Sequence, residues 1–93
     1  MTRDGHAGRG ECVPYARYGE TVESVIAQIE GAGPMATPRD VQSMPAGAAR
    51  NAVDCALWDL EAKRSGEPVW QLLGLPEPMP VTTAYTLSLG VPD

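Results

Sequence analysis

The chain has 93 residues, enough for one small domain, and its 12 acidic and seven basic side chains give a formal net charge of −5. Ten glycines and nine prolines take up a fifth of the chain and phenylalanine is absent, so few large apolar residues are available for a core. Because no basic run is longer than Lys63-Arg64, the charge pattern argues against nucleic-acid binding and against an anionic membrane surface.

Location and redox state follow from two further observations. No apolar run approaches the roughly 18 residues of a membrane span, and no signal-peptide core follows Met1, so we expect a soluble, cytoplasmic protein. Cys12 and Cys55 match no zinc or redox spacing. They are interpreted as two free, buried thiols, and a disulfide between them stays open as the alternative.

The first twelve residues resemble half of a β-hairpin. Asp4-Gly5 is a strong turn signal, but almost no strand precedes it, so the first half of the hairpin is expected to be missing. Residues 8–12 would form the returning strand, in which Gly8 and Gly10 permit a close backbone approach. The glycine spacing is not a dinucleotide-binding fingerprint, because no apolar strand precedes it and no helix follows at once.

Residues 13–20 form a predicted loop with the first candidate binding residues. Tyr15, Arg17 and Tyr18 combine two hydrogen-bonding aromatic side chains with a fork-shaped cation, a combination suited to small carboxylate-bearing ligands. In the alternative interpretation the tyrosines pack onto the domain and Arg17 pairs with Glu11 or Glu20. The loop sequence does not decide between the two.

Two helices are predicted before residue 45. The first runs from a Thr21 N-cap to about Glu30, with Val22, Val25, Ile26 and Ile29 on one face. The second is short: the segment 37–40 is typical of a capping box with Pro38 at the first helical position, and the helix is expected to end near Ser43.

The segment 45–75 carries the clearest pattern in the chain. Its apolar residues recur at helical spacing and form one stripe, which consists of Ala49, Ala52, Val53, Ala56, Leu57 and Leu60. Because the stripe is mostly alanine, we expect another backbone to press closely against it. Lys63, Arg64 and then Gly66 predict that the helix ends at about Ser65. A second helical turn is predicted over residues 69–73.

The polar side of this helix predicts surface ion pairs. Arg50 and Asp54 stand four residues apart, as do Asp59 and Lys63, so both pairs can form along the helix. Asp54 and Asp59 are separated by about 140° around the helix axis, which does not favour a shared metal ion. Surface pairing is therefore the preferred interpretation of both carboxylates.

Residues 81–89 change to a period of two, in which Val81, Thr83, Tyr85, Leu87 and Leu89 alternate with small or weakly polar residues. This pattern predicts a β-strand whose second face suits the inside of a barrel. A lone strand cannot close a sheet, so we expect that it pairs back onto the hairpin or that the chain has been cut.

Three segments together resemble the enolase superfamily: GRGECVPYARYGET, AARNAVDCALWDLEAKRSGEPVWQLLGL and TTAYTLSL. The likeness is to the muconate-lactonizing subgroup and, within it, to dipeptide epimerases of the L-Ala-D/L-Glu type. It implies an α+β fold in which residues 1–78 form a partial capping domain with an incomplete hairpin plus helices. Residues 79–93 would be a linker and the first strand of a truncated (β/α) barrel.

The resemblance also implies a chemistry. Family members use Mg²⁺ and remove a proton next to a carboxylate, with lysines and metal-binding carboxylates on later barrel strands. This chain lacks those strands, so we assign no catalytic residue and no metal ligand in it. Its single lysine, Lys63, lies on the capping-domain helix. The chain is expected to be a fragment that is inactive alone, and Mg²⁺ is implied for the full-length family only.

Substrate contacts can be carried over to five residues. The resemblance implies that Tyr15, Arg17 and Tyr18 lie on a loop that covers a dipeptide substrate, and that Thr86 and Ser88 lie near the C-terminal end of the barrel strand. A fragment of a cycloisomerase or N-acylamino-acid racemase stays open as an alternative. A small non-catalytic interaction module derived from the capping domain is the other alternative. A homo-oligomer also stays open.

Overall fold

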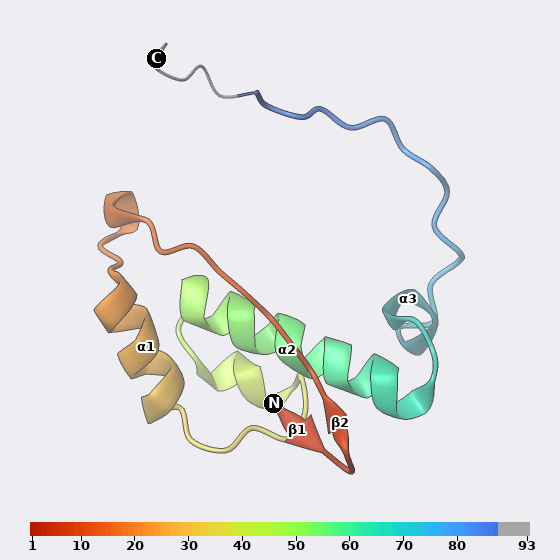
Figure 1. Ribbon diagram of the computed structural model, residues 1–93, viewed down its shortest axis with the longest axis horizontal. Coiled ribbons are helices and arrows are strands. Elements are labelled where there is room, and N and C mark those ends of the chain that lie inside the picture. The colour runs from red at the N-terminus through yellow and green to blue at the C-terminus, as the bar shows by residue number, and fades with distance from the viewer. Residues whose placement is uncertain (88–93) are drawn as a thin grey trace.

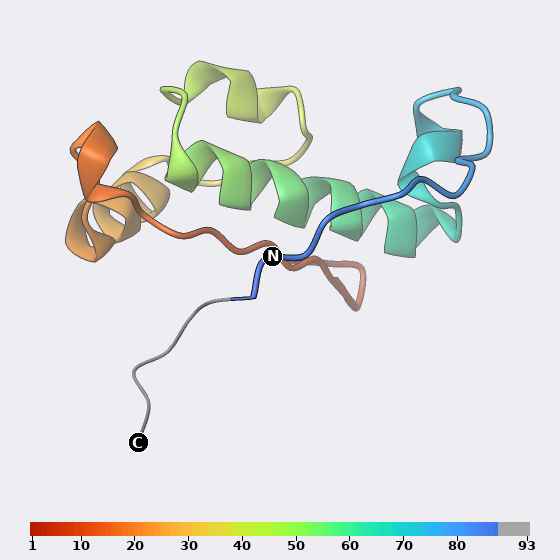
Figure 2. The same ribbon diagram turned by 90° about the horizontal axis from the view of Figure 1, so that it is seen from above.

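The computed structural model describes residues 1–87 (Figure 1). A small antiparallel hairpin and three α-helices form an α+β arrangement, as predicted, with helix α2 at its centre (Figures 1 and 2). The strands are β1 (Thr2–Arg3) and β2 (His6–Ala7), and the α-helices are α1 (Val22–Gly31), α2 (Ala48–Ser65) and α3 (Val69–Leu72). Two short 3₁₀ helices, η1 (Ala16–Tyr18) and η2 (Asp40–Ser43), complete the described elements.

The hairpin is present on both sides of the predicted turn. Thr2 pairs with Ala7 and Arg3 pairs with His6, and Asp4 and Gly5 have φ angles of 53° and 80°. Two positive φ angles are typical of the turn that best matches the twist of a hairpin. The strand before the turn has only two residues, Thr2 and Arg3, in agreement with the incomplete hairpin that the sequence predicts. The returning strand is also shorter than predicted, because residues 8–12 continue beyond it without a strand partner.

Helix α2 and its neighbours end where the sequence predicts. Gly66 has a φ of 73° and its N–H donates to the carbonyl oxygen of Ala62 at 2.9 Å, which closes the last turn of α2. Helix α1 begins with a capping box in which Thr21 and Ser24 exchange side-chain to backbone hydrogen bonds of 3.0 and 2.9 Å. Local capping chemistry therefore fixes both helices.

Helix η2 departs slightly from its prediction. It ends at Ser43 as expected, but it begins at Asp40 rather than at Pro38. The Asp40 carboxylate reaches back and accepts hydrogen bonds from the backbone N–H groups of Ala36 and Thr37, at 2.8 and 2.9 Å. These two bonds hold the pKa of Asp40 below its usual value.

The core lies under the predicted stripe of α2. All six stripe residues are buried, and Leu57 is fully buried. Side chains from α1 and η2 complete the main cluster, which consists of Val25, Val41, Met44, Ala49, Val53 and Leu57. The sequence prediction of the buried face of α2 is confirmed.

The extended segment of residues 8–12 lies directly on the alanine part of this stripe (Figures 1 and 2). A Cβ atom added to Gly8 would lie 2.6 Å from the Cβ of Leu60, and one added to Gly10 would lie 2.8 Å from the backbone nitrogen of Ala56. Real Cβ atoms do not approach so closely, so only glycine fits at these two positions. The predicted close backbone approach is confirmed.

The polar surface matches its prediction in part. Asp59 and Lys63 form an ion pair of 2.7 Å, as predicted. The predicted Arg50–Asp54 pair is wrong, since Arg50 donates instead to the side chain of Gln42 on η2. The two thiols are free, but neither is buried as predicted: Cys12 is partly buried, and Cys55 is exposed because it lies off the apolar stripe.

Residues 76–87 form neither helix nor strand, and all of them are exposed. Their backbone makes no hydrogen bond to any other residue of the described chain. Residues 81–87 find no edge to pair with in the described chain, so the strand predicted over residues 81–89 is not shown and stays a prediction. Its last two predicted residues, Ser88 and Leu89, lie outside the described residues. None of the helices in residues 1–87 has the length and apolarity needed to cross a membrane.

Candidate functional site

The candidate binding loop is a closed turn that lies close to the start of α1 (Figure 1). Helix η1 forms its centre, and Gly19 ends it with a φ of 74° and a hydrogen bond of 2.9 Å from its N–H to the carbonyl oxygen of Ala16. The N–H of Glu20 donates to the carbonyl oxygen of Tyr15 at 3.1 Å. The loop therefore has a defined backbone conformation.

The two tyrosines pack against each other rather than into the core. Their ring centroids are 6.3 Å apart with an interplanar angle of 73°, an edge-to-face arrangement. Tyr15 is 58% exposed and Tyr18 is 73% exposed, so both rings are accessible to a ligand. The alternative in which they pack onto the domain is wrong.

Arg17 lies between the tyrosines in sequence and is exposed. Within residues 1–87 it forms no ion pair, either with Glu11 or with Glu20, the two partners considered from the sequence. A guanidinium group with five donors suits a carboxylate, and here it is open to solvent.

Glu20 holds the loop in place. Its two carboxylate oxygens accept hydrogen bonds from the backbone N–H of Tyr15 at 3.2 Å and from that of Ala48 at 2.8 Å. Ala48 is the first residue of α2, whose N-cap residue Gly47 has no side chain to satisfy the free N–H groups of the helix. A carboxylate at this end of α2 also complements the helix dipole. Glu20 thus connects the loop to the central helix.

Sequence reasoning considered Glu20 only as a partner for Arg17 and missed this role. A signal was available, because Pro45-Ala46-Gly47 offers α2 no Ser, Thr, Asp or Asn as an N-cap. A cap supplied by another segment was therefore to be expected. Its source, 28 residues away in sequence, is visible only in the fold.

Two shallow hollows flank Tyr18. The first, of about 440 Å³, lies between the loop and the start of α2, and Tyr15, Tyr18 and Asn51 are among its lining residues. The second, of about 500 Å³, lies between the loop and α1, with Ser24 and Gln28 in its wall. The loop therefore offers polar groups and aromatic surface around two open depressions.

The other candidate contacts are not brought to this loop. Thr86 is exposed and belongs to the segment that makes no hydrogen bond to the rest of the described chain. Ser88 lies outside the described residues. The structure thus places Tyr15, Arg17 and Tyr18 together and leaves Thr86 apart from them.

Within residues 1–87, no group of three or more His, Cys, Asp or Glu side chains gathers at one point. Asp59 accepts from Lys63 and from the backbone N–H of Arg9, and these bonds lower its pKa. Lys63 also donates to the carbonyl oxygen of Ala7 at 3.0 Å. Both residues therefore connect α2 to the backbone of residues 7–9.

Comparison with known families decides the classification. The N-terminal domain model of the mandelate racemase / muconate lactonizing enzyme family matches residues 1–74. The chain belongs to this family. The resemblance to the enolase superfamily and to its dipeptide epimerases is confirmed, and the fold is the N-terminal domain of that group.

Individual relatives support the same grouping. L-Ala-D/L-Glu epimerase of Escherichia coli K12 is 47% identical over 98 aligned residues, which cover the whole chain and 30% of the relative. N-acetyl-D-glutamate racemase of a Pseudoalteromonas species is 40% identical, covering 91% of the chain and 29% of the relative. This chain therefore spans less than a third of the length of the relatives it matches.

A solved structure extends the comparison to three dimensions. It is an enolase family member from Agrobacterium tumefaciens with homology to dipeptide epimerases, described with bound sodium, L-Ala-L-Glu and an ordered loop. The identity is 56% and the TM-score is 0.73, covering 95% of this chain and 29% of the other. The helices and the hairpin are thus arranged as in a protein that binds a dipeptide.

Proposed function

We propose that this chain supplies the capping-domain part of an enolase-superfamily isomerase that epimerises a dipeptide at the carbon next to its carboxylate. The observation that carries the proposal is the 47% identity to an L-Ala-D/L-Glu epimerase along the whole chain. The dipeptide bound by the solved relative supports the same substrate class.

In this proposal residues 1–78 cover the substrate, and residues 79–93 lead into the first strand of a barrel. Arg17 would bind a substrate carboxylate through paired hydrogen bonds, while Tyr15 and Tyr18 would supply hydroxyl groups and exclude water. Thr86 and Ser88 would contact the substrate from the barrel side.

In this proposal, residues outside 1–87 carry out the proton transfer. We place the Mg²⁺ site and the acid and base residues outside residues 1–87, where the described side chains do not gather into a metal site. The chain alone is therefore expected to be inactive. A cytoplasmic location and a homo-oligomer stay predictions.

A chimaeric enzyme tests this proposal. The segment of the Escherichia coli epimerase that matches this chain is replaced by residues 1–93, and exchange of the substrate α-proton with deuterium is followed by NMR. We expect the chimaera to epimerise L-Ala-L-Glu. Arg17→Ala should lower kcat/KM at least about tenfold, since it removes a charge-assisted contact.

Arg39→Ala is the matched control, because Arg39 is also an exposed arginine but lines a different hollow. Equal losses in the two variants would contradict a role for Arg17 in binding. A folded chimaera without exchange would overturn the proposal and would favour the non-catalytic interaction module.

N-acetylglutamate is the second substrate to test, because an N-acetyl-D-glutamate racemase is 40% identical to the chain. Both substrates present a glutamate carboxylate next to an acylated nitrogen, so the same loop could serve either. The ratio of the two kcat/KM values in the chimaera decides between them.

A further inference from the structure

Glu20 closes the candidate binding loop at its base. Its N–H donates to the carbonyl oxygen of Tyr15 at 3.1 Å, and one oxygen of its carboxylate accepts from the N–H of Tyr15 at 3.2 Å. The two residues therefore exchange a pair of hydrogen bonds. Residues 16–19 lie between them, so these bonds fix both ends of the segment that carries the candidate contacts.

The second carboxylate oxygen connects this base to the central helix. It accepts from the N–H of Ala48, the first residue of α2, at 2.8 Å. Gly47 makes the approach possible, because a Cβ atom added there would lie 3.0 Å from this oxygen and press against it. The φ of 156° at Gly47 is also a conformation that residues with a side chain rarely adopt. Glu20 and Gly47 therefore form one junction between the loop and the helix.

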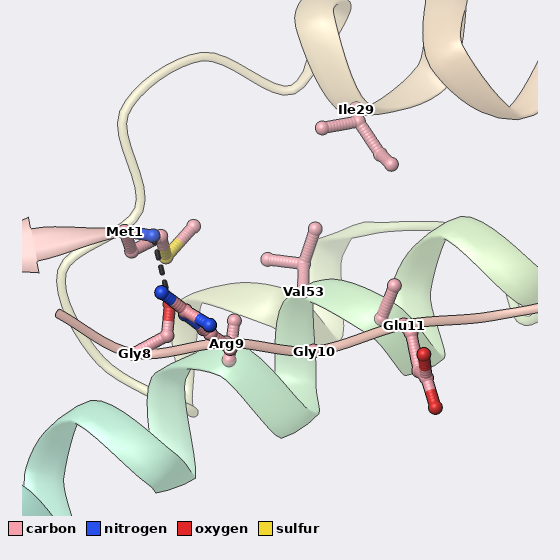
Figure 3. Close-up of a pocket in the computed structure, with 9 residues that line it drawn as sticks. Met1, Gly8, Arg9, Gly10, Glu11, Ile29 and Val53 are labelled. Carbon is pink, nitrogen blue, oxygen red and sulfur yellow. Dashed lines mark hydrogen bonds between the residues drawn. The ribbon is translucent and has the colours of Figure 1, made fainter.

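This junction borders both hollows beside the loop. Tyr18, Glu20 and Gly47 are the lining residues that the hollow of about 440 Å³ shares with the hollow of about 500 Å³. Another, larger hollow of about 690 Å³ lies between α1 and α2, with Ile29 and Val53 facing it (Figure 3). It shares no lining residue with the first two. A change at the junction is therefore expected to act on the loop and its two hollows.

The junction leaves the guanidinium group of Arg17 available. Glu20 is the acidic residue nearest to Arg17 in sequence, but its half-buried carboxylate accepts from backbone N–H groups instead. An ion pair between the two would neutralise the cation that a ligand carboxylate needs. The bonds of Glu20 to the backbone therefore keep the charge of the loop free for a ligand.

We propose that Glu20 is the positioning residue of the substrate-binding loop. It holds Tyr15, Arg17 and Tyr18 in their binding arrangement before the substrate arrives, so the loop is a preformed wall of the site. Without the carboxylate the substrate has to order the loop as it binds, and the lost conformational entropy lowers the affinity. The inference rests on the proposed function, because it names the residue that prepares the same loop.

A purely structural role of Glu20 predicts a different result. If Glu20 only stabilised the fold, the effect of its loss on KM would be the same with or without Arg17. If it positions the loop, its effect passes through Arg17 and disappears when Arg17 is removed. A double-mutant cycle of these two residues therefore separates the two roles.

The cycle is measured in the chimaeric enzyme that carries residues 1–93, with L-Ala-L-Glu as the substrate. Glu20→Gln should raise KM at least about fivefold and change kcat less than about twofold, because it weakens binding of the ground state and the transition state equally. In the Arg17→Ala background the same change should alter KM less than about twofold. Glu23→Gln, at an exposed position in the first turn of α1, is the matched control and should leave KM unchanged.

Gly47→Ala tests the other half of the junction. Its added Cβ atom displaces the Glu20 carboxylate from Ala48 and should also raise KM. Gly33→Ala is the control, since Gly33 has a positive φ of 73° as well, but nothing surrounds its added Cβ atom and it lies outside both hollows. This control should leave KM unchanged. Circular dichroism verifies that each variant is folded.

An unchanged KM in Glu20→Gln, or an equal rise in KM with and without Arg17, would overturn the positioning role. Failure of the proposed function is seen separately, because the parent chimaera would then not exchange the substrate α-proton. In that case the 93-residue chain alone tests the positioning. Nuclear Overhauser effects between the rings of Tyr15 and Tyr18, whose centroids are 6.3 Å apart, should be present without ligand and should weaken in Glu20→Gln. Equal effects in the two chains would overturn the proposal.

Discussion

Helix α2 and residues 76–87 represent two extremes of packing in one small chain. The apolar stripe of α2 is covered on one side by the core and on the other by residues 8–12, here called the glycine segment, so that Leu57 and Leu60 are 0% and 2% exposed. Val81 and Leu87 in the second region are 80% and 81% exposed. Apolar content alone therefore does not decide which segment is buried.

The difference lies in where the backbone hydrogen bonds are made. A helix satisfies its own N–H and C=O groups along its length and needs a neighbour only for its apolar face. A strand must find both an edge and a covering layer. Residues 76–87 find neither a partner edge nor a covering layer within the described chain. Residues 8–12 are covered by α2, and on one edge the N–H of Arg9 donates to Asp59.

The largest expected effect comes from the buried side of this comparison. Leu57→Ala removes a fully buried side chain and should lower the free energy of unfolding by about 2–5 kcal/mol. Leu87→Ala is the matched control and should change it by less than about 0.5 kcal/mol, because Leu87 is exposed. Urea unfolding followed by circular dichroism measures both values. Similar losses would mean that residues 76–87 are packed in solution.

The contact between the glycine segment and α2 gives the second prediction. Gly10→Ala places a Cβ atom against the backbone of Ala52 and Ala56, so the free energy of unfolding should fall by about 1–3 kcal/mol. Gly31→Ala is the control, since nothing lies near its added Cβ and its backbone is helical. The control should be neutral or stabilising by up to about 1 kcal/mol. A stable Gly10→Ala variant would contradict the close packing.

Much of this fold was predictable because its causes are local. The spacing of Ala52, Val53 and Leu57 identifies the buried face of α2, and Gly66 identifies its end. The turn at Asp4-Gly5 and the Thr21 cap are decided by their own side chains and backbones in the same way. The three residues of the candidate binding loop, Tyr15, Arg17 and Tyr18, were selected from their chemistry, and their role in binding stays a prediction.

The features that were missed depend on contacts between distant segments. Arg50 bonds to Gln42 of another helix rather than to Asp54, and no spacing rule within α2 contains that information. The role of Glu20 likewise depends on α2 lying next to the loop. The period of two at residues 81–87 is a strand pattern, but a strand pattern does not supply a partner edge.

The connection between the loop and α2 gives the third prediction. Glu20→Gln keeps one acceptor oxygen but loses the second one and the charge, so it should lower the free energy of unfolding by about 1 kcal/mol. Amide exchange at Tyr15 and Ala48 should become faster. Glu77→Gln makes the same charge change at an exposed position and should leave both quantities unchanged. Unchanged exchange at Tyr15 in the Glu20→Gln variant would show that the loop is held by other contacts.

The smallest effect is expected from Asp59, whose ion pair with Lys63 is exposed to solvent. Lys63 and the N–H of Arg9 lower the folded-state pKa of Asp59 below its ordinary value of 3.8. Its contribution to stability is therefore complete above pH 3.8 and is lost as the pH falls through the lower folded-state pKa. The difference in unfolding free energy between the wild-type chain and Asp59→Asn should be constant near neutral pH and should shrink in acid. A difference that stays constant throughout acid titration would mean that the Asp59 charge does not stabilise the contact between α2 and the backbone of Ala7 and Arg9.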